Sequence, residues 1–361
     1  MQHNKKIHAI VDNLLIWYGE NARDLPWRRT NDPYCVYVSE IMLQQTQVKT
    51  VIPYWERWLR ELPTIQAAAE ASPAKIHKLW EGLGYYTRVR NLQKAAQLIV
   101  ADHGGKFPET LEAVLALPGI GRYTAGAICS IAFNQPTPLL DGNVIRVLTR
   151  IFGIAENPKE KATNTRLWKL AEELVLHAAQ VPHHKTACSH LNQSLMELGA
   201  LVCLPRNPQC LVCPAQKLCA AFKEGRTEEL PNLGIREKAT ARRFMAFVIE
   251  YQEKFLVRQR PAGIVNGHLW EFPNVEVTGL KDGKALAARE LFGVTAVKME
   301  ALITVKHSIT RYRITLEAFC VNLESTKQIK RRQGVWKTPA QMRQLAFSAA
   351  HKKVFDKATN R

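Results

Sequence analysis

The sequence predicts a multidomain protein in which an all-helical N-terminal domain precedes a smaller α+β domain. Its 361 residues are enough for two domains that each bury a core. Up to about residue 222, apolar residues recur at helical spacing between Pro, Gly and Asn. A polar, charged stretch without period follows and indicates a linker, and strand-like runs come after it. We therefore expect domains at 1–222 and 243–361, joined by a linker at 223–242.

In the N-terminal part, capping residues and glycines set where the helices begin and end. Asp32 and Ser72 each precede a proline, so each pairs a capping side chain with a residue suited to a first helical turn. The glycines within 82–84 interrupt the helical pattern. Asp141 stands before 142–152, where apolar residues recur on one helical face. These signals predict helices connected by short loops.

The C-terminal part has a different pattern. Residues 244–251 and 255–260 alternate in polarity on either side of a polar turn, which indicates two strands. A further alternating run occupies 311–321. The chain then closes with a helix at 339–358. We therefore expect a smaller α+β domain here.

The composition favours a polyanionic partner and argues against a membrane span. The chain has 50 Lys and Arg against 32 Asp and Glu, and the formal net charge of +18 attracts a polyanion. No apolar stretch is long enough to cross a bilayer, and the amphipathic N-terminal segment lacks a signal-peptide core. We expect a cytoplasmic protein. Charge alone leaves open a basic protein without affinity for nucleic acid.

The stretch LPGIGRYTAGAI at 117–128 contains glycines that suggest a phosphate-binding loop. A dinucleotide fingerprint needs G-x-G-x-x-G directly after a strand, but here Gly119 and Gly121 are followed only by Gly126. The preceding residues 107–117 carry a helical stripe instead of strand alternation. The loop therefore joins two helices, and the pattern argues against a nucleotide cofactor.

A glycine turn between two helices is similar to the helix-hairpin-helix element. In that element, backbone N–H groups at the start of the second helix bind a DNA phosphate without reading the base sequence. Gly119 and Gly121 are the candidate phosphate-binding residues. A tight turn between packed helices has the same pattern, so the motif alone leaves both interpretations open.

Four of the eight cysteines are crowded into one segment with the spacing C-x6-C-x2-C-x5-C. They are Cys203, Cys210, Cys213 and Cys219. In a cytoplasmic chain, such a group favours a metal centre over disulfides, and either zinc or an iron–sulfur cluster suits four thiolates. The H-x-E motif of zinc-dependent deaminases does not occur in the sequence. The spacing by itself leaves zinc and iron–sulfur open.

The hairpin, the aspartate at 141 and the cysteine pattern, in this order, resemble the helix-hairpin-helix DNA glycosylases that carry a [4Fe–4S] cluster. The resemblance extends over about 10–222. Within that superfamily, LPWR at 25–28, VSEIMLQQTQV at 38–48 and EGLGYYTRVRNL at 81–92 are similar to the adenine DNA glycosylases, the MutY family. That family removes adenine mispaired with 8-oxoguanine. The resemblance implies one [4Fe–4S] cluster on the four cysteines.

Two carboxylates suit the cleavage of an N-glycosidic bond. The reaction builds positive charge on the sugar and negative charge on the leaving base, so it needs an acid and a carboxylate. Glu40 lies in a mostly apolar helix, where burial raises a pKa, and Asp141 precedes a helix whose dipole favours the ionised form. We expect the two pKa values to move in opposite directions. By pattern alone, a solvated Glu40 and a capping Asp141 are the commoner interpretations.

The resemblance assigns roles to these residues. Glu40 would protonate adenine at N7 and later activate water, and Asp141 would stabilise or attack the oxocarbenium ion. Asn143 would help to orient the site. All three would therefore be catalytic.

Further positions match family residues that contact the flipped base or wedge into the duplex. Trp27 and Arg28 would contact the base, and Gln193 would lie near the adenine. Gln45 and Tyr85 would insert into the duplex, although core packing is an alternative for Tyr85.

Tyr123 separates two reaction classes. At this point of the hairpin, the glycosylase/lyases of the superfamily carry a lysine whose amine attacks the sugar to form a Schiff base. A phenol cannot do so, and the resemblance therefore implies a monofunctional glycosylase. Thymine-mismatch glycosylases share this tyrosine, so they remain an alternative.

The C-terminal part has segments, at 268–274 and 287–294, that resemble pieces of a Nudix domain. Nudix hydrolases place two further acidic residues after R-E-L to hold metal ions, but here 289–291 is followed by Phe-Gly. The MutY family uses such a domain to recognise 8-oxoguanine. Its usual Phe-Ser-His loop is replaced by Ile-Thr-Arg at 309–311, where Thr310 keeps a hydroxyl; a purely structural hairpin is the alternative.

Taken with the resemblance, the sequence predicts a base-excision-repair adenine glycosylase that acts on A opposite 8-oxoguanine or G in double-stranded DNA. We expect a monomer without membrane contact, associated with the nucleoid in the cytoplasm. The alternatives are a thymine-mismatch glycosylase and a non-enzymatic helix-hairpin-helix DNA-binding protein. A nucleotide-pool hydrolase is disfavoured by the missing acidic residues.

Overall fold

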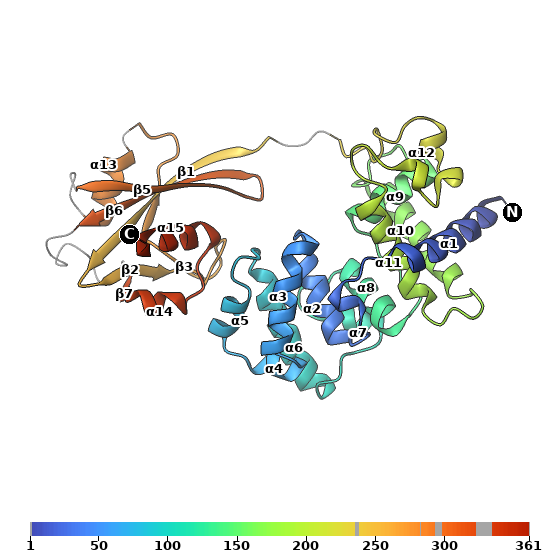
Figure 1. Ribbon diagram of the computed structural model, residues 1–361, viewed down its shortest axis with the longest axis horizontal. Helices are drawn as coiled ribbons and strands as arrows, with labels where there is room; N and C mark the ends of the chain where they lie inside the picture. Colours follow the sequence, from blue (N-terminus) through green and yellow to red (C-terminus); the bar gives the residue numbers. More distant parts are fainter. Residues whose placement is uncertain (1, 235–237, 282, 293–297, 323–333, 361) are drawn as a thin grey trace. The chain divides into compact units, whose positions relative to one another are not determined.

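The computed structural model describes residues 2–234, 238–281, 283–292, 298–322 and 334–360. The chain forms two compact units (Figure 1), one from Met1–Glu70 and Arg90–Arg236, the other from Ala71–Val89 and Glu237–Arg361. The grouping of 71–89 with the C-terminal residues has no counterpart in the sequence pattern. The predicted domain boundaries at 222 and 243 stay a prediction.

The first unit is helical, as predicted. Its elements are α1 (Gln2–Asn21), η1 (Pro26–Arg28), α2 (Pro33–Leu43), α3 (Val48–Glu61), α4 (Ile65–Glu70), most of α6 (Thr87–His103), α7 (Leu111–Leu115), α8 (Arg122–Phe133), α9 (Gly142–Phe152), α10 (Lys161–Ala178), α11 (Ala187–Leu201), η2 (Cys210–Val212), η3 (Gln216–Leu218) and α12 (Ala220–Lys223).

The helix starts of this unit follow from side-chain caps. Asp32 accepts a hydrogen bond from the Tyr34 N–H at 2.8 Å before α2, and Asp141 accepts one from the Val144 N–H at 2.7 Å before α9. These bonds satisfy N–H groups that lack a partner within a first helical turn. The helix starts predicted from Asp32 and Asp141 are therefore confirmed.

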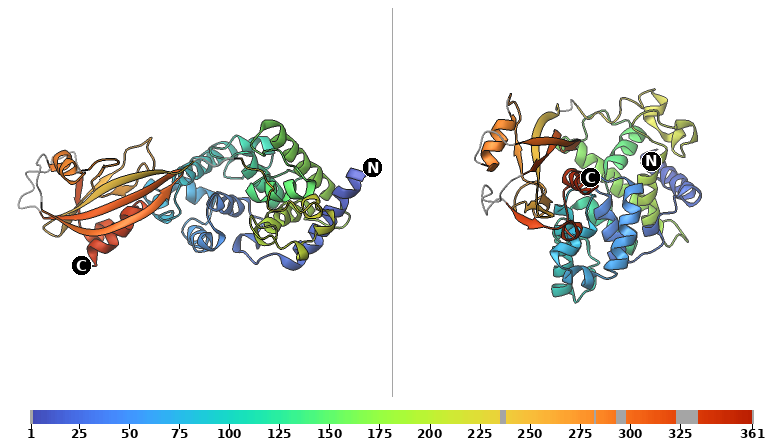
Figure 2. Two further views of the ribbon diagram at one scale, coloured as in Figure 1. Left: turned by 90° about the horizontal axis from the view of Figure 1, so that it is seen from above. Right: turned by 60° about the vertical axis from the view of Figure 1, so that its left-hand side comes forward.

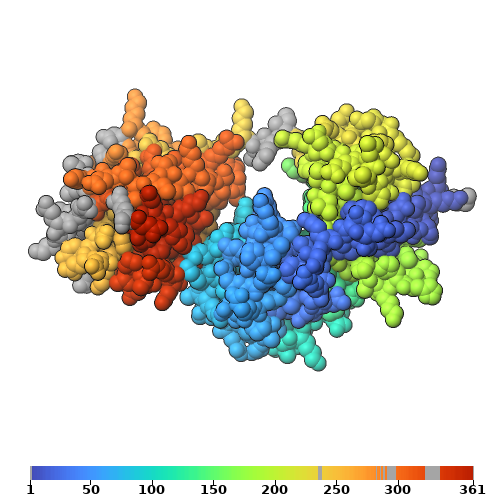
Figure 3. All heavy atoms as spheres, viewed as in Figure 1, coloured from blue at the N-terminus to red at the C-terminus, as the bar shows by residue number. Residues whose placement is uncertain are grey.

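The N-terminal helix packs on segments from much later in the chain. In Figure 3 the dark blue α1 lies against the yellow-green residues of α10 and α11. Ile10, Val11 and Leu14 of α1 are completely buried, which removes apolar surface from water. Helix α11 also packs against α8 and α9. Helix α11 is therefore the element around which the residues of the candidate active site are assembled.

The second unit combines a short helical segment with a sheet. Its elements are α5 (Pro73–Leu79), β1 (Thr240–Tyr251), β2 (Lys254–Gln259), β3 (Trp270–Glu271), β4 (Asn274–Glu276), α13 (Gly283–Phe292), β5 (Met299–Ile309), β6 (Tyr312–Asn322), β7 (Val335–Lys337), α14 (Pro339–Arg343) and α15 (Ala349–Thr359).

The sheet has the strand order β3-β2-β1-β6-β5, with β4 paired to β1 and β7 to β2. Strands β1 and β6 are parallel, whereas β5 and β6 form an antiparallel hairpin. Helix α15 packs on one face and α13 on the other (Figure 2). Ala246 and Val248 face α15, while Phe247 and Ile249 belong to the core on the opposite side. Both faces are covered, and the predicted α+β class is confirmed.

The predicted closing helix at 339–358 is wrong in one respect. The structure divides it into α14 and α15. Between them the backbone pairs with β3, because the Trp270 N–H donates to the Ala346 oxygen at 2.8 Å and Phe347 is completely buried. Pairing with a neighbouring strand satisfies backbone groups that a helix would satisfy internally.

No helix of the described part of the chain is both long and apolar enough to cross a membrane.

Candidate active site

The helical unit contains a cavity of about 190 Å³ lined by residues from η1, α2, α8, α11 and the start of α9. Seven residues singled out from the sequence meet there: Trp27, Arg28, Glu40, Tyr123, Asp141, Asn143 and Gln193. They come from segments that lie far apart in the chain, so the packing of these helices brings the segments together.

Glu40 is held in a helix that is buried on almost every side. Only 4% of the surface of Glu40 is exposed. Burial raises the pKa of Glu40 to about 7; the neighbouring Asp141 also raises this pKa, whereas the Tyr123 hydrogen bond and the Arg28 charge lower it. The predicted burial and raised pKa are confirmed. The carboxyl group is therefore poised between its two protonation states near neutral pH.

Tyr123 lies in the first turn of α8 and points into the cavity. Its hydroxyl lies 2.9 Å from Oε2 of Glu40 and 3.3 Å from Sδ of Met196. The single hydroxyl proton can be donated to only one of these acceptors at a time. Burial and the nearby Glu40 and Asp141 raise the pKa of Tyr123, so the phenol keeps its proton.

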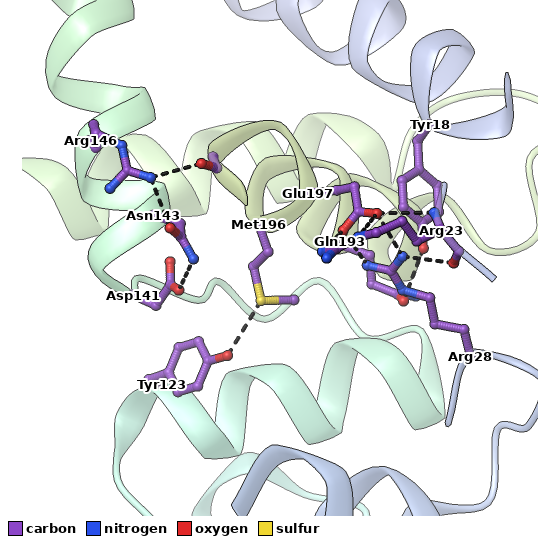
Figure 4. A network of polar contacts seen from close by, with 11 residues as sticks. Tyr18, Arg23, Arg28, Tyr123, Asp141, Asn143, Arg146, Gln193, Met196 and Glu197 are labelled. Carbon is purple, nitrogen blue, oxygen red and sulfur yellow. Dashed lines mark hydrogen bonds and ion pairs between the residues drawn. The ribbon is translucent and has the colours of Figure 1, made fainter. Parts of the chain in front are cut away.

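Asp141 caps α9 and is fixed through both of its carboxylate oxygens. The Val144 N–H donates to Oδ1 at 2.7 Å, and the Asn143 side-chain amide donates to Oδ2 at 3.1 Å (Figure 4). Burial nevertheless raises the pKa of Asp141, because these hydrogen bonds and the Arg146 charge only partly offset it. The prediction that the two pKa values move in opposite directions is wrong, since burial dominates at both sites.

Asn143 is oriented by Arg146 and by close packing. Nη2 of Arg146 donates to Oδ1 of Asn143 at 2.9 Å and to the Gly199 oxygen at 2.8 Å, and its Nε donates to the Cys203 oxygen at 2.7 Å. A Cβ atom at Gly199 would lie 2.6 Å from the Asn143 Cβ. Glycine therefore allows α11 to approach the start of α9 at this point.

A buried carboxylate in the cavity wall was not found from the sequence. Glu197 of α11 is 1% exposed and binds both Arg23 and Arg28, as Figure 4 shows. Burial alone would raise the pKa of Glu197, but the hydrogen bonds from Arg23 and Arg28 lower it to about 2. A signal existed, because Glu197 stands four residues after Gln193 in a largely apolar helix.

The remaining predicted base-contacting residues have defined neighbours. The Tyr18 hydroxyl donates to Oε1 of Gln193 at 3.0 Å, and the Gln193 amide donates to the Ser189 hydroxyl at 3.1 Å. Trp27 is 6% exposed and meets Trp55 edge-on, with ring centroids 6.0 Å apart. Both side chains are thereby held in fixed orientations at the cavity.

The predicted phosphate-binding loop connects α7 to α8. Gly119 has a φ of +78°, and a Cβ atom there would lie 2.6 Å from the Asn91 side chain, so this position requires glycine. Gly121 is the N-cap residue of α8 and is exposed. The loop therefore presents the N-terminal backbone of α8 to solvent, an arrangement that suits an anion.

The two predicted wedge residues lie in different units, at Gln45 and Tyr85. Both have left-handed backbone conformations, with φ of 55° for Gln45 and 49° for Tyr85, and both side chains are exposed. Non-glycine residues adopt this conformation only where the surrounding structure holds them in it, and such positions cluster at functional sites.

The four cysteines line one small cavity with apolar walls that include Val147 and Ile151. Nη1 of the completely buried Arg150 lies 3.3 Å from Sγ of Cys203. The other hydrogen bonds of the Arg150 side chain go to backbone oxygens, and the ion pairs of the described residues do not include it. Within the described ranges, no three His, Cys, Asp or Glu side chains are gathered tightly enough to grip a single metal ion.

In the sheet unit, Thr310 lies at the tip of the β5–β6 hairpin. It is exposed, has a φ of 51°, and donates its hydroxyl proton to the Ile309 oxygen at 2.7 Å. Helix α13 carries Arg289 and Glu290, while Gly293 lies outside the described residues. The hairpin tip therefore presents the Thr310 side chain to solvent.

Two family models match the sequence. The model described as HhH-GPD superfamily base excision DNA repair protein matches residues 38–173, and a NUDIX domain model matches residues 245–357.

Curated relatives match almost the whole chain. The adenine DNA glycosylase of Rattus norvegicus is 39% identical, over 97% of this chain and 78% of that protein. The human enzyme of the same name is 35% identical, over 97% of this chain and 74% of that protein. The adenine DNA glycosylase of Buchnera aphidicola subsp. Schizaphis graminum is 34% identical, over 91% of this chain and 93% of that protein.

Solved structures match the helical part. A thermostable thymine-DNA glycosylase superposes with a TM-score of 0.55 at 31% identity, over 62% of this chain and 100% of that chain. Endonuclease III from a non-covalent DNA complex superposes with a TM-score of 0.50 at 21% identity, over 62% of this chain and 97% of that chain. The second likeness is one of fold alone.

Proposed function

Because the chain belongs to the adenine DNA glycosylase family, we propose that its substrate is duplex DNA in which adenine stands opposite 8-oxoguanine or guanine. It is a DNA glycosylase of base excision repair. The observation that carries the proposal is a buried carboxyl group, Glu40, which shares a cavity with a second carboxylate, Asp141.

The first chemical requirement is an acid for the departing adenine. With its pKa raised to about 7, Glu40 keeps a large protonated fraction at neutral pH, which suits general acid catalysis. We assign to Glu40 the protonation of adenine at N7 and, once ionised, the activation of the attacking water. Tyr123 donates to Oε2 of Glu40 and holds this carboxyl group in place.

The second requirement is negative charge beside the sugar. Asp141 accepts hydrogen bonds through both oxygens, and these favour its ionised form against the effect of burial. We assign to it the stabilisation of the oxocarbenium ion or direct attack on it. Asn143 orients Asp141 by donating to Oδ2.

The adenine must leave the stack to reach this cavity. A cavity of about 190 Å³ suits one nucleobase, and Trp27, Arg28 and Gln193 line it as base contacts. Gln45 and Tyr85 are exposed on loops and would wedge into the duplex. Gly119 and Gly121 would bind a DNA phosphate at the start of α8.

The absence of an amine at the hairpin makes the enzyme monofunctional. Tyr123 occupies the position at which a lyase needs its lysine, and a phenol cannot form a Schiff base. Treatment with borohydride during turnover should therefore trap no covalent complex, whereas a Tyr123→Lys variant offers the missing amine as a positive control. Trapping of the unchanged protein in high yield would contradict this assignment.

The cysteine loop suits one [4Fe–4S] cluster, held by Cys203, Cys210, Cys213 and Cys219. Its four cysteines line one cavity with apolar walls, which supports a buried cluster at this place. The buried Arg150 cation, bonded otherwise to backbone oxygens, would balance an anionic cluster. When bound, the cluster would cross-link the cysteine loop. An absorption band at about 400 nm, together with stoichiometric iron, would distinguish the cluster from zinc.

The sheet unit would read the base opposite the adenine. Thr310 at the exposed hairpin tip carries the hydroxyl that we assign to 8-oxoguanine recognition. After Glu290 the acidic residues of Nudix hydrolases are missing from the sequence, so this NUDIX domain is not expected to hydrolyse nucleotides. We propose that the protein acts as a monomer on DNA of the nucleoid in the cytoplasm.

One experiment tests the substrate. Single-turnover reactions, followed by alkali, are run on duplexes that carry A:8-oxoguanine, A:G, A:C or T:G. We expect cleavage at adenine opposite 8-oxoguanine and opposite G. Cleavage restricted to T:G would instead support a thymine-mismatch glycosylase, and tight binding without any cleavage would support a DNA-binding protein.

A further inference from the structure

Glu197 forms the centre of a charge cluster in the wall of the catalytic cavity. It accepts hydrogen bonds from Nε and Nη2 of Arg23 at 2.7 and 2.6 Å, and from the Arg23 backbone N–H at 3.0 Å. It also accepts from Nη1 and Nη2 of Arg28 at 3.1 and 2.9 Å. A carboxylate with 1% exposure therefore binds two guanidinium groups at once.

Arg28 is held by several contacts in the wall of the catalytic cavity. Besides Glu197, its Nη1 bonds the Arg23 oxygen at 3.1 Å, and its guanidinium lies 5.5 Å from the centre of the Tyr18 ring. Glu40 lines the same cavity, and the charge of Arg28 favours the ionised form of Glu40. The position of the Arg28 guanidinium therefore affects the protonation state of Glu40.

The charges of the cluster do not cancel. Two guanidinium groups and one carboxylate leave one net positive charge, and loss of the carboxylate would leave two. A larger positive charge beside a carboxyl group favours its ionised form and lowers its pKa. An ionised Glu40 cannot donate a proton to adenine.

The other groups that face these carboxylates are few and come from several elements. Tyr123 of α8, Asp141 at the start of α9 and Arg28 of η1 act on Glu40. Arg23 and Arg28 act on Glu197, and the charge of Glu197 raises the pKa of Tyr18 of α1. Histidines do not line the cavity among the described residues, so none titrates between the two sites.

We propose that Glu197 is a positioning residue that holds Arg28 on its own carboxylate and thereby keeps Glu40 in the protonated form required for base release. The inference rests on the proposed role of Glu40 as the acid. The sequence pattern does not predict this interaction, because neither Arg23 nor Arg28 stands at helical spacing from Glu197.

The test is the pH dependence of adenine release. Second-order single-turnover rate constants on the A:8-oxoguanine duplex are measured between about pH 5 and about pH 9 for the unchanged protein, Glu197→Gln and Glu197→Asp. Because the acid must be protonated, the rate should fall as the pH rises through about 7. In Glu197→Gln we expect this decline about one unit lower, so that the rate at alkaline pH drops about tenfold and recovers in acid. Glu197→Asp keeps the negative charge, so its decline should stay close to that of the unchanged protein.

Two further variants make the result specific. Asp24→Asn removes the same charge from the adjacent loop, but Asp24 pairs with Arg29 outside the cavity, so the decline should not move. Arg28→Met, with Glu197 intact, should move the decline upward, because a positive charge beside Glu40 is lost; its rates are expected to be lower at every pH. The position of the decline is therefore read separately from the rate.

An equal loss of rate at every pH in Glu197→Gln, with the decline unmoved, would overturn the inference and leave Glu197 a structural residue. If Glu197→Gln does not fold, Arg28→Met still tests the link from Arg28 to Glu40, and a decline that stays or moves downward would overturn the inference. An unchanged protein without any alkaline decline would overturn the assignment of Glu40 itself, and this failure is distinct from the other two.

Discussion

Two buried glutamates, one in each unit, have the same side chain and opposite charge behaviour. Glu40 in the helical unit is 4% exposed and Glu271 in the sheet unit is 2% exposed. Burial acts to raise the pKa of both. At Glu271 the interaction with His351 and the charges of Arg260 and Arg258 overcome burial and lower the pKa. At Glu40 the hydrogen bond from the Tyr123 hydroxyl does not overcome burial, and the pKa rises to about 7.

The difference shows that burial alone does not set the charge of a carboxyl group. Arg258 Nε donates to Glu271 at 2.8 Å, and Arg260 also donates to it, so the ionised form is satisfied. Within the described residues, no guanidinium hydrogen-bonds to Glu40, although Arg28 lines the same cavity. A buried carboxyl group kept from cations suits proton transfer, whereas a paired one stabilises the fold.

The largest expected effect tests the unpaired carboxyl group. Glu40→Gln should lower the single-turnover rate of adenine release by about 1000-fold, because a general acid contributes about two to four orders of magnitude. DNA affinity should change by less than about threefold. Glu271→Gln is the matched control from the sheet unit and should release adenine at nearly the unchanged rate. Equal losses in both variants would remove the distinction between the two glutamates.

The next effect concerns the paired carboxylate. Glu271→Gln should lower the free energy of unfolding at neutral pH by about 2–3 kcal/mol, because it leaves Arg258 and Arg260 without a counter-ion. This is below the loss for a fully buried pair, since these arginine side chains are 35% and 24% exposed. Urea unfolding followed by circular dichroism measures it, with the exposed Glu250→Gln as a control expected within about 0.5 kcal/mol. A loss no larger than in the control would contradict the pairing.

The pH dependence of stability should have opposite signs at the two sites. The folded pKa of Glu40 is raised, so its favourable contribution is present below the unfolded pKa and is lost as the pH rises through about 7. Glu40→Gln should therefore raise the free energy of unfolding by about 2 kcal/mol at about pH 8 and change it little in acid. The folded pKa of Glu271 is lowered, so its contribution is present at neutral pH and is lost in acid. Urea unfolding of both variants at about pH 4 and about pH 8 checks the two signs; the same sign for both would refute the comparison.

The smallest effect belongs to an exposed group, Thr310 at the hairpin tip. Thr310→Ala removes a hydroxyl that we assign to 8-oxoguanine, and a single hydrogen bond contributes about 1 kcal/mol. The ratio of rates on A:8-oxoguanine and A:G duplexes should therefore fall by about fivefold. Ser308→Ala, an exposed neighbour in the same hairpin, should leave this ratio unchanged. A similar ratio in both variants would assign the hairpin a structural role.

Local patterns were sufficient for much of the fold. Asp32 and Asp141 cap helices where the sequence predicted them, because a cap depends only on residues a few positions away. The closing helix was predicted incorrectly, because Ala346 and its neighbours pair with Trp270, far away in the chain. Helical spacing contains no information about such a partner.

The site divides in the same way. Glu40 was predicted to be buried because its own helix is apolar, and the structure bears this out. Glu197 was missed, because its partners Arg23 and Arg28 stand more than 160 positions away and meet it only when α11 packs beside η1. The raised pKa of Asp141 was also missed, since a capping position says nothing about how deeply the cap is buried.

The sequence by itself determined the order of helices and strands, the glycine turn, the cysteine spacing and the two candidate carboxylates, because each depends on neighbours along the chain. The tertiary structure alone decided which of the buried carboxylates receive guanidinium partners. The packed fold places the guanidinium groups of Arg23 and Arg28 against Glu197, whereas Glu40 receives a hydrogen bond from the Tyr123 phenol. Charge in a buried site depends on groups within a few ångströms in space, and only the packed fold sets those distances.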